Sequence, residues 1–265
     1  MRWLLLGLCV GLWLAGCASV PERFERHAEA LGLESGWVPG SGFRLATFRN
    51  RASTSGGALH LYLDGDGSPW LTRTRVASDP TPRNALVLEL LARDPVPALY
   101  LGRPCYHGEQ AAPGCDPWLW TCGRYSESVI AAMATALDRL IAAESIERVT
   151  LIGYSGGGVI AWHLAQRVPQ VERLVTVAAN LDLQAWTRRH GYSPLRGSLD
   201  PAAGPPLRAS VRQWHLVGRH DENVPAEVTE PLRQQLGPAF RRVSIDAGHA
   251  DGWLERWPDL LNELD

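Results

Sequence analysis

Hydrophobic and polar positions along this chain follow two alternating patterns. Short apolar or alternating runs, typical of β-strands, occur at residues 43–48, 58–63, 96–101, 149–153, 171–178, 212–217 and 241–245. Apolar residues at helical spacing occur at residues 22–31, 79–94, 126–144, 159–167, 225–236 and 253–264. From residue 58 onward, strands alternate with helices. This predicts an α/β fold with a mostly parallel sheet and helices on both faces.

Two segments depart from this alternation. The runs at residues 43–48 and 58–63 are separated by a turn, so we expect them to pair as a hairpin that leads into the sheet. Residues 180–210 are rich in proline and show no clean period. A loop of this length inside a compact domain is usually functional. We therefore expect residues 180–210 to overhang a site as a partial lid.

The N-terminus has a pattern of its own. Arg2 precedes an apolar run at residues 3–14, which is shorter than the roughly 20 residues that span a bilayer but suits a secretory signal. The run ends in Leu-Ala-Gly-Cys, with the cysteine at Cys17, and this tetrapeptide resembles the lipobox of bacterial lipoproteins. The resemblance implies cleavage before Cys17 and acylation of its thiol, which would anchor the protein to a membrane. Ala18 after the cysteine resembles lipoproteins that are sorted to the outer membrane and face the periplasm.

We therefore divide the chain into a signal peptide at residues 1–16, a tether with a short helix at 17–40, and one domain at 41–265. The length of 265 residues fits one large domain, and a hydrophobic content of 45% is enough for a sizeable core. The sequence shows no internal repeat and no second domain. We expect a monomer.

Composition excludes several kinds of chemistry. The net charge of −2 argues against nucleic acid as a partner, and all 26 positive residues are arginine. Without lysine the chain has no Walker A loop, Schiff-base lysine or Ser-Lys dyad. Residues 64–68 resemble the start of an EF-hand calcium loop, but Pro69 and Arg75 stand where the loop needs glycine and glutamate. We therefore expect no metal and no cofactor.

The sequence Gly-Tyr-Ser-Gly-Gly at residues 153–157 is the strongest motif in the chain. It follows an apolar strand and runs directly into a helix, as a Gly-x-Ser-x-Gly turn does. Such a turn exposes the hydroxyl of Ser155 above a helix N-terminus, where free N–H groups suit a developing oxyanion. The alternative is a tight turn in which Ser155 only caps the helix.

A serine nucleophile needs a histidine base. His249 lies just past the last predicted strand, in a loop that reaches the same edge of the sheet as Ser155. His220 is the alternative, since it also follows a strand directly. The other histidines lie inside strands or helices or in poorly patterned segments.

The base in turn needs an acid that orients it. Asp221 follows the strand at residues 212–217 and is our prediction for this role. Glu222 is the nearest alternative. Asp182, after the preceding strand, is a second one. Residues 155, 221 and 249, each after a successive strand, resemble the catalytic order of serine hydrolases with the α/β-hydrolase fold, from about residue 43 to the C-terminus.

This resemblance also implies where an oxyanion would bind. One donor would be the N–H of Gly156, directly after the nucleophile. The other would come from the loop after an early strand, commonly His-Gly, which here reads Asp64-Gly65-Asp66-Gly67. The N–H of Asp66 matches the second donor, and Asp64 replaces the histidine of the family. We expect the Asp66 side chain to point away from the oxyanion.

Three cysteines follow Cys17, and an oxidising periplasm favours a disulfide between two of them. The segment between Cys105 and Cys115 contains the turn signal Pro113-Gly114, so we predict a disulfide between these two cysteines. Cys122 is then left over, and we interpret it as a small buried residue.

Together these features predict a serine hydrolase that cleaves small-molecule carboxylic esters through an acyl-enzyme, lipid-anchored at the bacterial cell envelope. A peptidase or thioesterase would use the same triad, and the sequence does not separate them. The alternative from another class is a non-catalytic envelope lipoprotein. Trp70, Trp186 and Trp253 are predicted near the site, where they would form an apolar slot or belong to the core.

Overall fold

The computed structural model describes residues 18–52 and 57–263. The predicted signal peptide and Cys17 lie outside the described residues. An eight-stranded sheet has the order β1-β2-β6-β3-β7-β8-β9-β10. Strands β6 to β10 of this order run parallel, and β1 and β2 are antiparallel additions at one edge. The strands are β1 Glu34–Pro39, β2 Arg44–Arg49, β3 Ala58–Leu63, β6 Ala98–Leu101, β7 Arg148–Tyr154, β8 Val171–Val177, β9 Arg212–Gly218 and β10 Arg241–Ile245.

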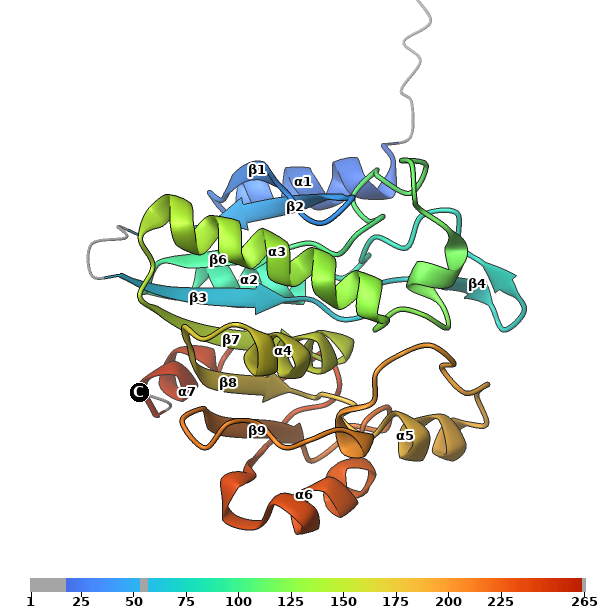
Figure 1. The fold of residues 1–265 in the computed structure, drawn as a ribbon, viewed down its shortest axis with the longest axis vertical. Coiled ribbons are helices and arrows are strands. Elements are labelled where there is room, and N and C mark those ends of the chain that lie inside the picture. Colours follow the sequence, from blue (N-terminus) through green and yellow to red (C-terminus); the bar gives the residue numbers. More distant parts are fainter. Residues whose placement is uncertain (1–17, 53–56, 264–265) are drawn as a thin grey trace, which may run out of the picture.

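Helices cover both faces of this sheet. They are α1 Val20–Ala30, α2 Leu86–Ala92, α3 Glu127–Glu144, α4 Gly156–Arg167, α5 Leu183–His190, α6 Glu230–Leu236 and α7 Trp257–Glu263. In Figure 1, α3 and α4 lie in front of the sheet, and α2 and α7 lie behind it. Strand β3 shows why two cores form: Leu59 and Leu61 pack with α3 and α4, whereas Tyr62 packs with α2 and α7. The predicted fold class is confirmed.

The predicted hairpin of residues 43–48 with 58–63 is wrong. Strand β6 lies between β2 and β3, and β2 instead forms a hairpin with β1. Strand β3 is buried over nearly its whole length, so it needs a neighbour on each side, and β6 and β7 fill both places.

Part of the predicted tether at residues 17–40 belongs to the folded domain. Strand β1 adds to the sheet, and Phe24 and Ala28 of α1 are buried in the core. The sequence signal for β1 is weak because this edge strand buries only Val38. The N-terminal boundary of the domain therefore lies before residue 41.

The structure also differs from the prediction in two further segments, residues 225–236 and 180–210. The helix expected at residues 225–236 divides into a 3₁₀ turn, Ala226–Thr229, and α6. Pro231 lies in the first turn of α6, where its missing N–H breaks no helical hydrogen bond. Residues 180–210 contain helix α5. The sequence did not predict this helix because it is short and has few apolar residues.

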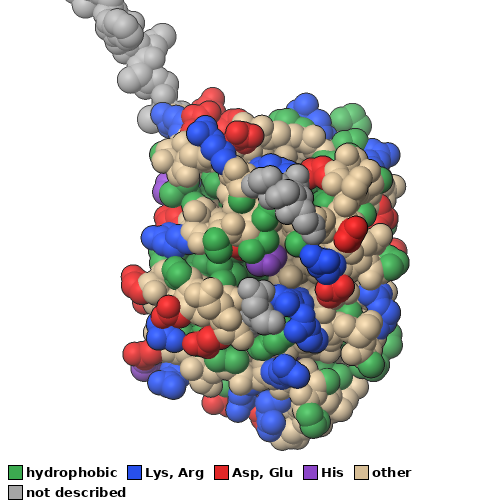
Figure 2. Space-filling view, turned by 90° about the vertical axis from the view of Figure 1, so that its left-hand side faces the viewer, with side chains coloured by type: hydrophobic (Ala, Val, Ile, Leu, Met, Phe, Trp, Pro, Cys, Tyr) green, Lys and Arg blue, Asp and Glu red, His purple; other side chains and the backbone are tan. Residues whose placement is uncertain are grey.

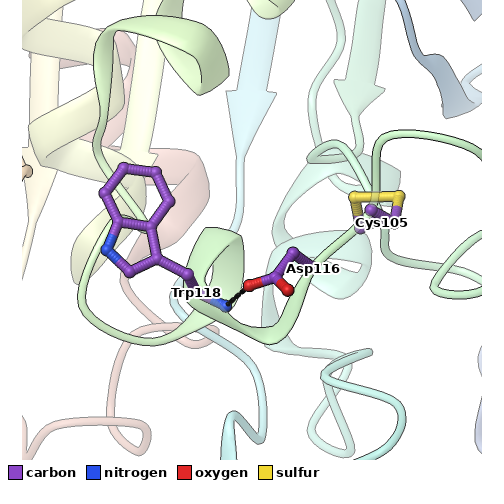
Figure 3. The surroundings of a disulfide bond; sticks show 4 residues. Cys105, Asp116 and Trp118 are labelled. Carbon is purple, nitrogen blue, oxygen red and sulfur yellow. Dashed lines mark hydrogen bonds between the residues drawn. A yellow bond between two sulfur atoms is a disulfide. The ribbon is translucent and has the colours of Figure 1, made fainter.

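Cys105 and Cys115 form a disulfide in the structure, with Cα atoms 5.5 Å apart. Figure 3 shows the segment that follows: the Asp116 carboxylate accepts a hydrogen bond from the Trp118 N–H at 2.8 Å, and the indole extends away from the disulfide. Cys122 is a free thiol and is half-buried rather than part of the core. In the part of the chain that is described, no helix has both the length and the apolar character needed to cross a membrane.

Candidate active site

Ser155 sits at a strained turn between β7 and α4. Its backbone has φ 49° and ψ −122°, a conformation that residues with a side chain rarely adopt. The flanking glycines are required by close packing, since a Cβ on Gly153 would lie 2.5 Å from the Gly157 carbonyl oxygen and one on Gly157 would overlap the Leu63 carbonyl. The turn therefore holds the Ser155 hydroxyl out at the carboxyl end of β7.

The structure brings the three predicted side chains into a hydrogen-bonded line. His249 Nε2 lies 3.1 Å from Ser155 Oγ, and His249 Nδ1 lies 2.8 Å from Asp221 Oδ2. The Asp221 side chain is fully buried, and its other oxygen accepts hydrogen bonds from the N–H groups of Asn223 and Val224 at 2.9 and 2.8 Å. This loop therefore fixes the carboxylate, and the carboxylate fixes the imidazole.

The sheet explains why residues so far apart in sequence meet. Ser155 follows β7, Asp221 follows β9 and His249 follows β10, and these strands are parallel. Their carboxyl ends share the edge at which Figure 1 shows strand β4, Trp70–Thr72, and helix α5. The His249 carbonyl also accepts a hydrogen bond at 3.0 Å from the indole of Trp253, which is fully buried. Trp253 is thus a core residue and supports the histidine loop.

The structure places the alternative residues elsewhere. Asp182 accepts a hydrogen bond from the Ala185 N–H at 2.7 Å and caps α5. Glu222 is exposed to solvent. His220 is also exposed and pairs with Asp246 at 2.8 Å. None of these residues contacts Ser155 or the Nδ1 atom of His249 in the described structure.

Asn223 is a site residue that sequence reasoning missed. Its side-chain amide nitrogen lies 3.0 Å from His249 Nε2, beside the serine hydroxyl. Its carbonyl oxygen accepts hydrogen bonds from His190 Nε2 at 2.7 Å and Trp186 Nε1 at 3.2 Å. Asn223 therefore connects α5 to the histidine. An asparagine in a polar loop gives no sequence signal for such a position.

The loop after β3 packs directly on the serine turn. A Cβ on Gly65 would lie 3.4 Å from Ser155 Cβ, which shows how closely the backbone approaches. Gly156 begins α4, and the first N–H groups of a helix lack intrahelical acceptors. Gly156, one predicted oxyanion donor, therefore directly follows Ser155, and the loop that contains the other, Asp66, packs against the Ser155 side chain.

The Asp66 side chain packs against Gly156, the residue that follows Ser155. A Cβ on Gly156 would overlap an Asp66 carboxylate oxygen, so the carboxylate lies against the helix start. It is bonded to Arg103 Nη1 at 3.0 Å, Arg124 Nη1 at 2.7 Å and Tyr125 OH at 2.6 Å. Burial raises the pKa of Asp66, but the two guanidinium groups outweigh it and hold the pKa below its usual value.

These arginines explain how an acidic side chain is tolerated next to an oxyanion site. Arg103 follows β6 and Arg124 precedes α3, and both side chains are almost fully buried. Neither residue had a sequence signal, because the contacts cross the fold. Asp64, one step earlier in the loop, accepts a hydrogen bond from the Gly65 N–H at 2.7 Å, and burial raises its pKa to about 7.

A pocket of about 870 Å³ opens above Ser155 and His249. Its volume suits a small-molecule ligand. Apolar side chains in its wall include Trp70, Trp186 and Leu195. No cluster of metal-ligating side chains occurs within residues 18–52 and 57–263.

Comparisons with known proteins agree with this architecture. A family model described as the alpha/beta hydrolase fold matches residues 82–197. No curated protein matches by sequence. Among solved structures, an esterase of Pyrococcus furiosus has a TM-score of 0.62 and 16% identity, with 89% of this chain and 92% of that chain covered.

Two further structures have similar values. A Xanthomonas campestris protein described as an α/β serine hydrolase without a lid has a TM-score of 0.56 and 12% identity, with 88% and 91% of the two chains covered. The carboxylesterase CesB of Bacillus subtilis has a TM-score of 0.53 and 14% identity, with 93% and 96% covered. The chain therefore has the α/β-hydrolase fold.

Proposed function

We propose that this protein is a serine hydrolase that cleaves carboxylic esters through an acyl-enzyme. The observation that carries the proposal is the line from Ser155 Oγ through His249 to Asp221, on a strained turn that opens into a pocket. Two structures with the same fold are named as an esterase and a carboxylesterase, which supports esters as the substrate class.

In the acylation half, His249 Nε2 takes the Ser155 hydroxyl proton as the oxygen attacks the ester carbonyl carbon. Asp221 keeps the other ring proton on Nδ1 and stabilises the imidazolium. The carbonyl electron pair moves onto oxygen and returns when the C–O bond to the alcohol breaks. His249 then gives its proton to the departing alcohol, which leaves an acyl group on Ser155.

In the deacylation half, water takes the place of the alcohol. His249 removes a proton from the water as its oxygen attacks the acyl carbon, and it returns that proton to Ser155 Oγ as the acid leaves. Both halves pass through an oxyanion, which the N–H groups of Gly156 and Asp66 would bind. Protein groups and water suffice for the cycle, so the proposal includes no metal or cofactor.

We further propose a location. The protein would be cleaved before Cys17, acylated there, and held as a monomer on the bacterial outer membrane, facing the periplasm. The lipobox-like sequence supports this proposal. Metabolic labelling with a radioactive fatty acid tests it: the label should appear on the wild-type protein and be lost in Cys17→Ser. Label that persists in Cys17→Ser would refute an anchor at this residue.

The hydrolase proposal is tested by a fluorophosphonate probe and a panel of esters, thioesters and amides. We expect stoichiometric labelling of the wild type and turnover of short-chain p-nitrophenyl esters. Ser155→Ala should lose both, whereas Ser210→Ala, at an exposed position, serves as the matched control. Faster turnover of amides or thioesters would identify a peptidase or thioesterase. An unlabelled wild type without turnover would favour a non-catalytic lipoprotein.

A further inference from the structure

The pocket above Ser155 carries more positive than negative charge. The arginines in its wall are Arg73, Arg83 and Arg124, and the acidic residues are Asp64 and Asp66. No glutamate of the described chain lines it. The whole protein, in contrast, has a net charge of −2. Positive charge is thus concentrated at the site itself.

The acidic side chains in the wall are already neutralised. Asp66 lies between Arg103 and Arg124, so this cluster keeps one net positive charge. The Asp64 carboxyl is buried under the backbone of its own loop and holds the Gly65 N–H. Neither carboxylate forms an ion pair with Arg73 or Arg83 in the described structure, and the Asp66 carboxylate is already bonded to Arg103, Arg124 and Tyr125.

Arg73 and Arg83 have no acidic partner among the described residues. Some exposed arginines elsewhere do have one: Arg167 pairs with Glu127 and Arg44 pairs with Glu109, both at 2.6 Å. Arg73 and Arg83 are also exposed and line the pocket, but neither forms an ion pair within the described residues. Two unpaired guanidinium groups in one pocket fit an anionic ligand, for which arginine is the preferred recognition residue.

Arg73 and Arg83 come from two different loops that line the pocket. Arg83 follows a proline-rich turn that packs on the oxyanion loop: the Ser68 N–H donates to the Pro80 carbonyl at 2.9 Å, and a Cβ on Gly67 would overlap that carbonyl. Arg73 lies in the turn between β4, Trp70–Thr72, and β5, Arg75–Val76. Figure 1 shows this hairpin projecting at the carboxyl edge of the sheet.

A different segment supplies further apolar residues to the pocket. Trp186, Tyr192 and Leu195, from α5 and the residues after it, line the same cavity. The pocket therefore combines exposed arginines with apolar side chains, and Ser155 lines the same pocket.

From this arrangement we infer that the substrate is an ester that carries an anionic group, a carboxylate or a phosphate, bound by Arg73 and Arg83. The inference rests on the proposed function and names the substrate class for that site. A cleft with one sign of charge also attracts an oppositely charged ligand from a distance, and salt screens this attraction. Turnover of anionic esters should consequently fall as ionic strength rises.

The test compares pairs of esters that differ only in charge, on the purified full-length protein. One pair is p-nitrophenyl hemiglutarate and its neutral methyl ester, with the anion on the acyl side. The other is 3-butyryloxypropyl phosphate and its neutral dimethyl phosphate, with the anion on the alcohol side. We expect kcat/KM to favour the anionic member of at least one pair about tenfold, as one charged hydrogen bond supplies. A preference in the first pair indicates a carboxylate on the acyl side of the substrate, and a preference in the second indicates a phosphate on the alcohol side.

Arginine variants then locate the recognition. Arg73→Gln and Arg83→Gln should each lower the ratio of anionic to neutral kcat/KM severalfold, and the double variant should abolish it. Arg75→Gln, in the same hairpin but outside the pocket wall, should keep the wild-type ratio. The neutral ester measured on each variant is its internal reference for folding.

The outcomes separate this inference from the proposed function. Ser155-dependent hydrolysis of neutral esters with no preference for either anionic partner overturns the anion site and leaves the hydrolase. An anion preference that the double variant retains also overturns the assignment to Arg73 and Arg83. A wild type that turns over no ester at all overturns the proposed function, and this inference with it.

Discussion

The chain contains two similar histidine–carboxylate pairs at different places on one sheet. At the carboxyl edge, His249 Nδ1 lies 2.8 Å from Asp221. In the amino-terminal half of β3, His60 Nδ1 lies 2.7 Å from Asp94. Both carboxylates are fully buried, so distance and burial do not distinguish the two pairs.

What distinguishes them is the neighbour of each pair. His249 has a serine hydroxyl on its other ring nitrogen and faces the pocket. The Asp94 oxygen that holds His60 instead accepts a hydrogen bond from Tyr62 OH at 2.6 Å, and the buried Trp257 donates to that hydroxyl at 3.2 Å. Figure 2 looks onto the end of the molecule where β3 begins, and charged side chains of both signs are spread over it.

A buried histidine–carboxylate pair is therefore not by itself a catalytic unit. Parallel strands deliver loops, and with them nucleophiles and ligand pockets, to their carboxyl ends. The His60–Asp94 pair instead connects β3, in the middle of the sheet, to the segment that follows α2. We interpret the His249–Asp221 pair as part of the proposed catalytic site and the His60–Asp94 pair as a contact that stabilises the fold. Two experiments test this contrast directly, and two more test features around the site.

The largest effect should come from the acid of the proposed triad. Asp221→Asn leaves the hydrogen-bonded geometry nearly intact but favours the wrong histidine tautomer, which should lower kcat roughly 10⁴-fold. Asp182→Asn, in the cap of α5, should change kcat far less. Steady-state hydrolysis of a p-nitrophenyl ester measures both variants. A loss of equal size in Asp182→Asn would mean that Asp221 is not the acid.

The second experiment removes the acid of the other pair. Asp94→Ala leaves the His60 ring and the Tyr62 hydroxyl buried without their carboxylate, which should lower the free energy of unfolding by about 3 kcal/mol. Urea denaturation measures this loss. Under native conditions, kcat should stay within about twofold of the wild type, because Asp94 bonds His60 and Tyr62 and contacts neither Ser155 nor His249 in the described structure. A specific loss of kcat with unchanged stability would reverse our interpretation of this pair.

The third experiment concerns the disulfide near the carboxyl edge. Replacing Cys105 and Cys115 together by serine should cost about 2–3 kcal/mol, since the bond closes a loop with a sequence separation of 10 residues. Activity should fall as well, because Arg103 and Tyr106 beside the bond hold Asp66. Thermal unfolding with and without reductant measures the first effect. Cys122→Ser is the control, and its melting should respond to reductant as that of the wild type does.

The smallest effect is a pH dependence at Asp64. Burial raises its folded pKa to about 7, from an ordinary value of 3.8, so between these values the folded protein holds a proton that the unfolded chain releases. The contribution of Asp64 to the free energy of unfolding is therefore largest below about pH 4, where the carboxyl is protonated in both states, and is lost as the pH rises to about 7. Asn at position 64 does not titrate, so the stability of Asp64→Asn relative to the wild type should rise by roughly 2 kcal/mol between pH 5 and 6.5. Equal slopes in both proteins, measured by urea denaturation, would contradict the raised pKa.

The comparison also separates what a sequence can and cannot predict. Gly153 and Gly157 around Ser155 are a local requirement, since a Cβ at either position would clash with backbone nearby. The order of the three triad candidates follows from strand periodicity, because each lies just after a strand. Periodicity could not predict that β6 separates β2 from β3, since pairing partners are chosen by burial across the whole sheet.

The sequence by itself determined the alternating fold, the strained serine turn and the edge of the sheet to which serine, aspartate and histidine are delivered, because these depend on local backbone geometry and on strand direction. Only the tertiary structure decided that Asp221 rather than Asp182 meets His249, that Asn223 joins them, and that Arg103 and Arg124 neutralise Asp66. These contacts join residues from different strands and loops. Their side-chain directions depend on packing that no single segment encodes.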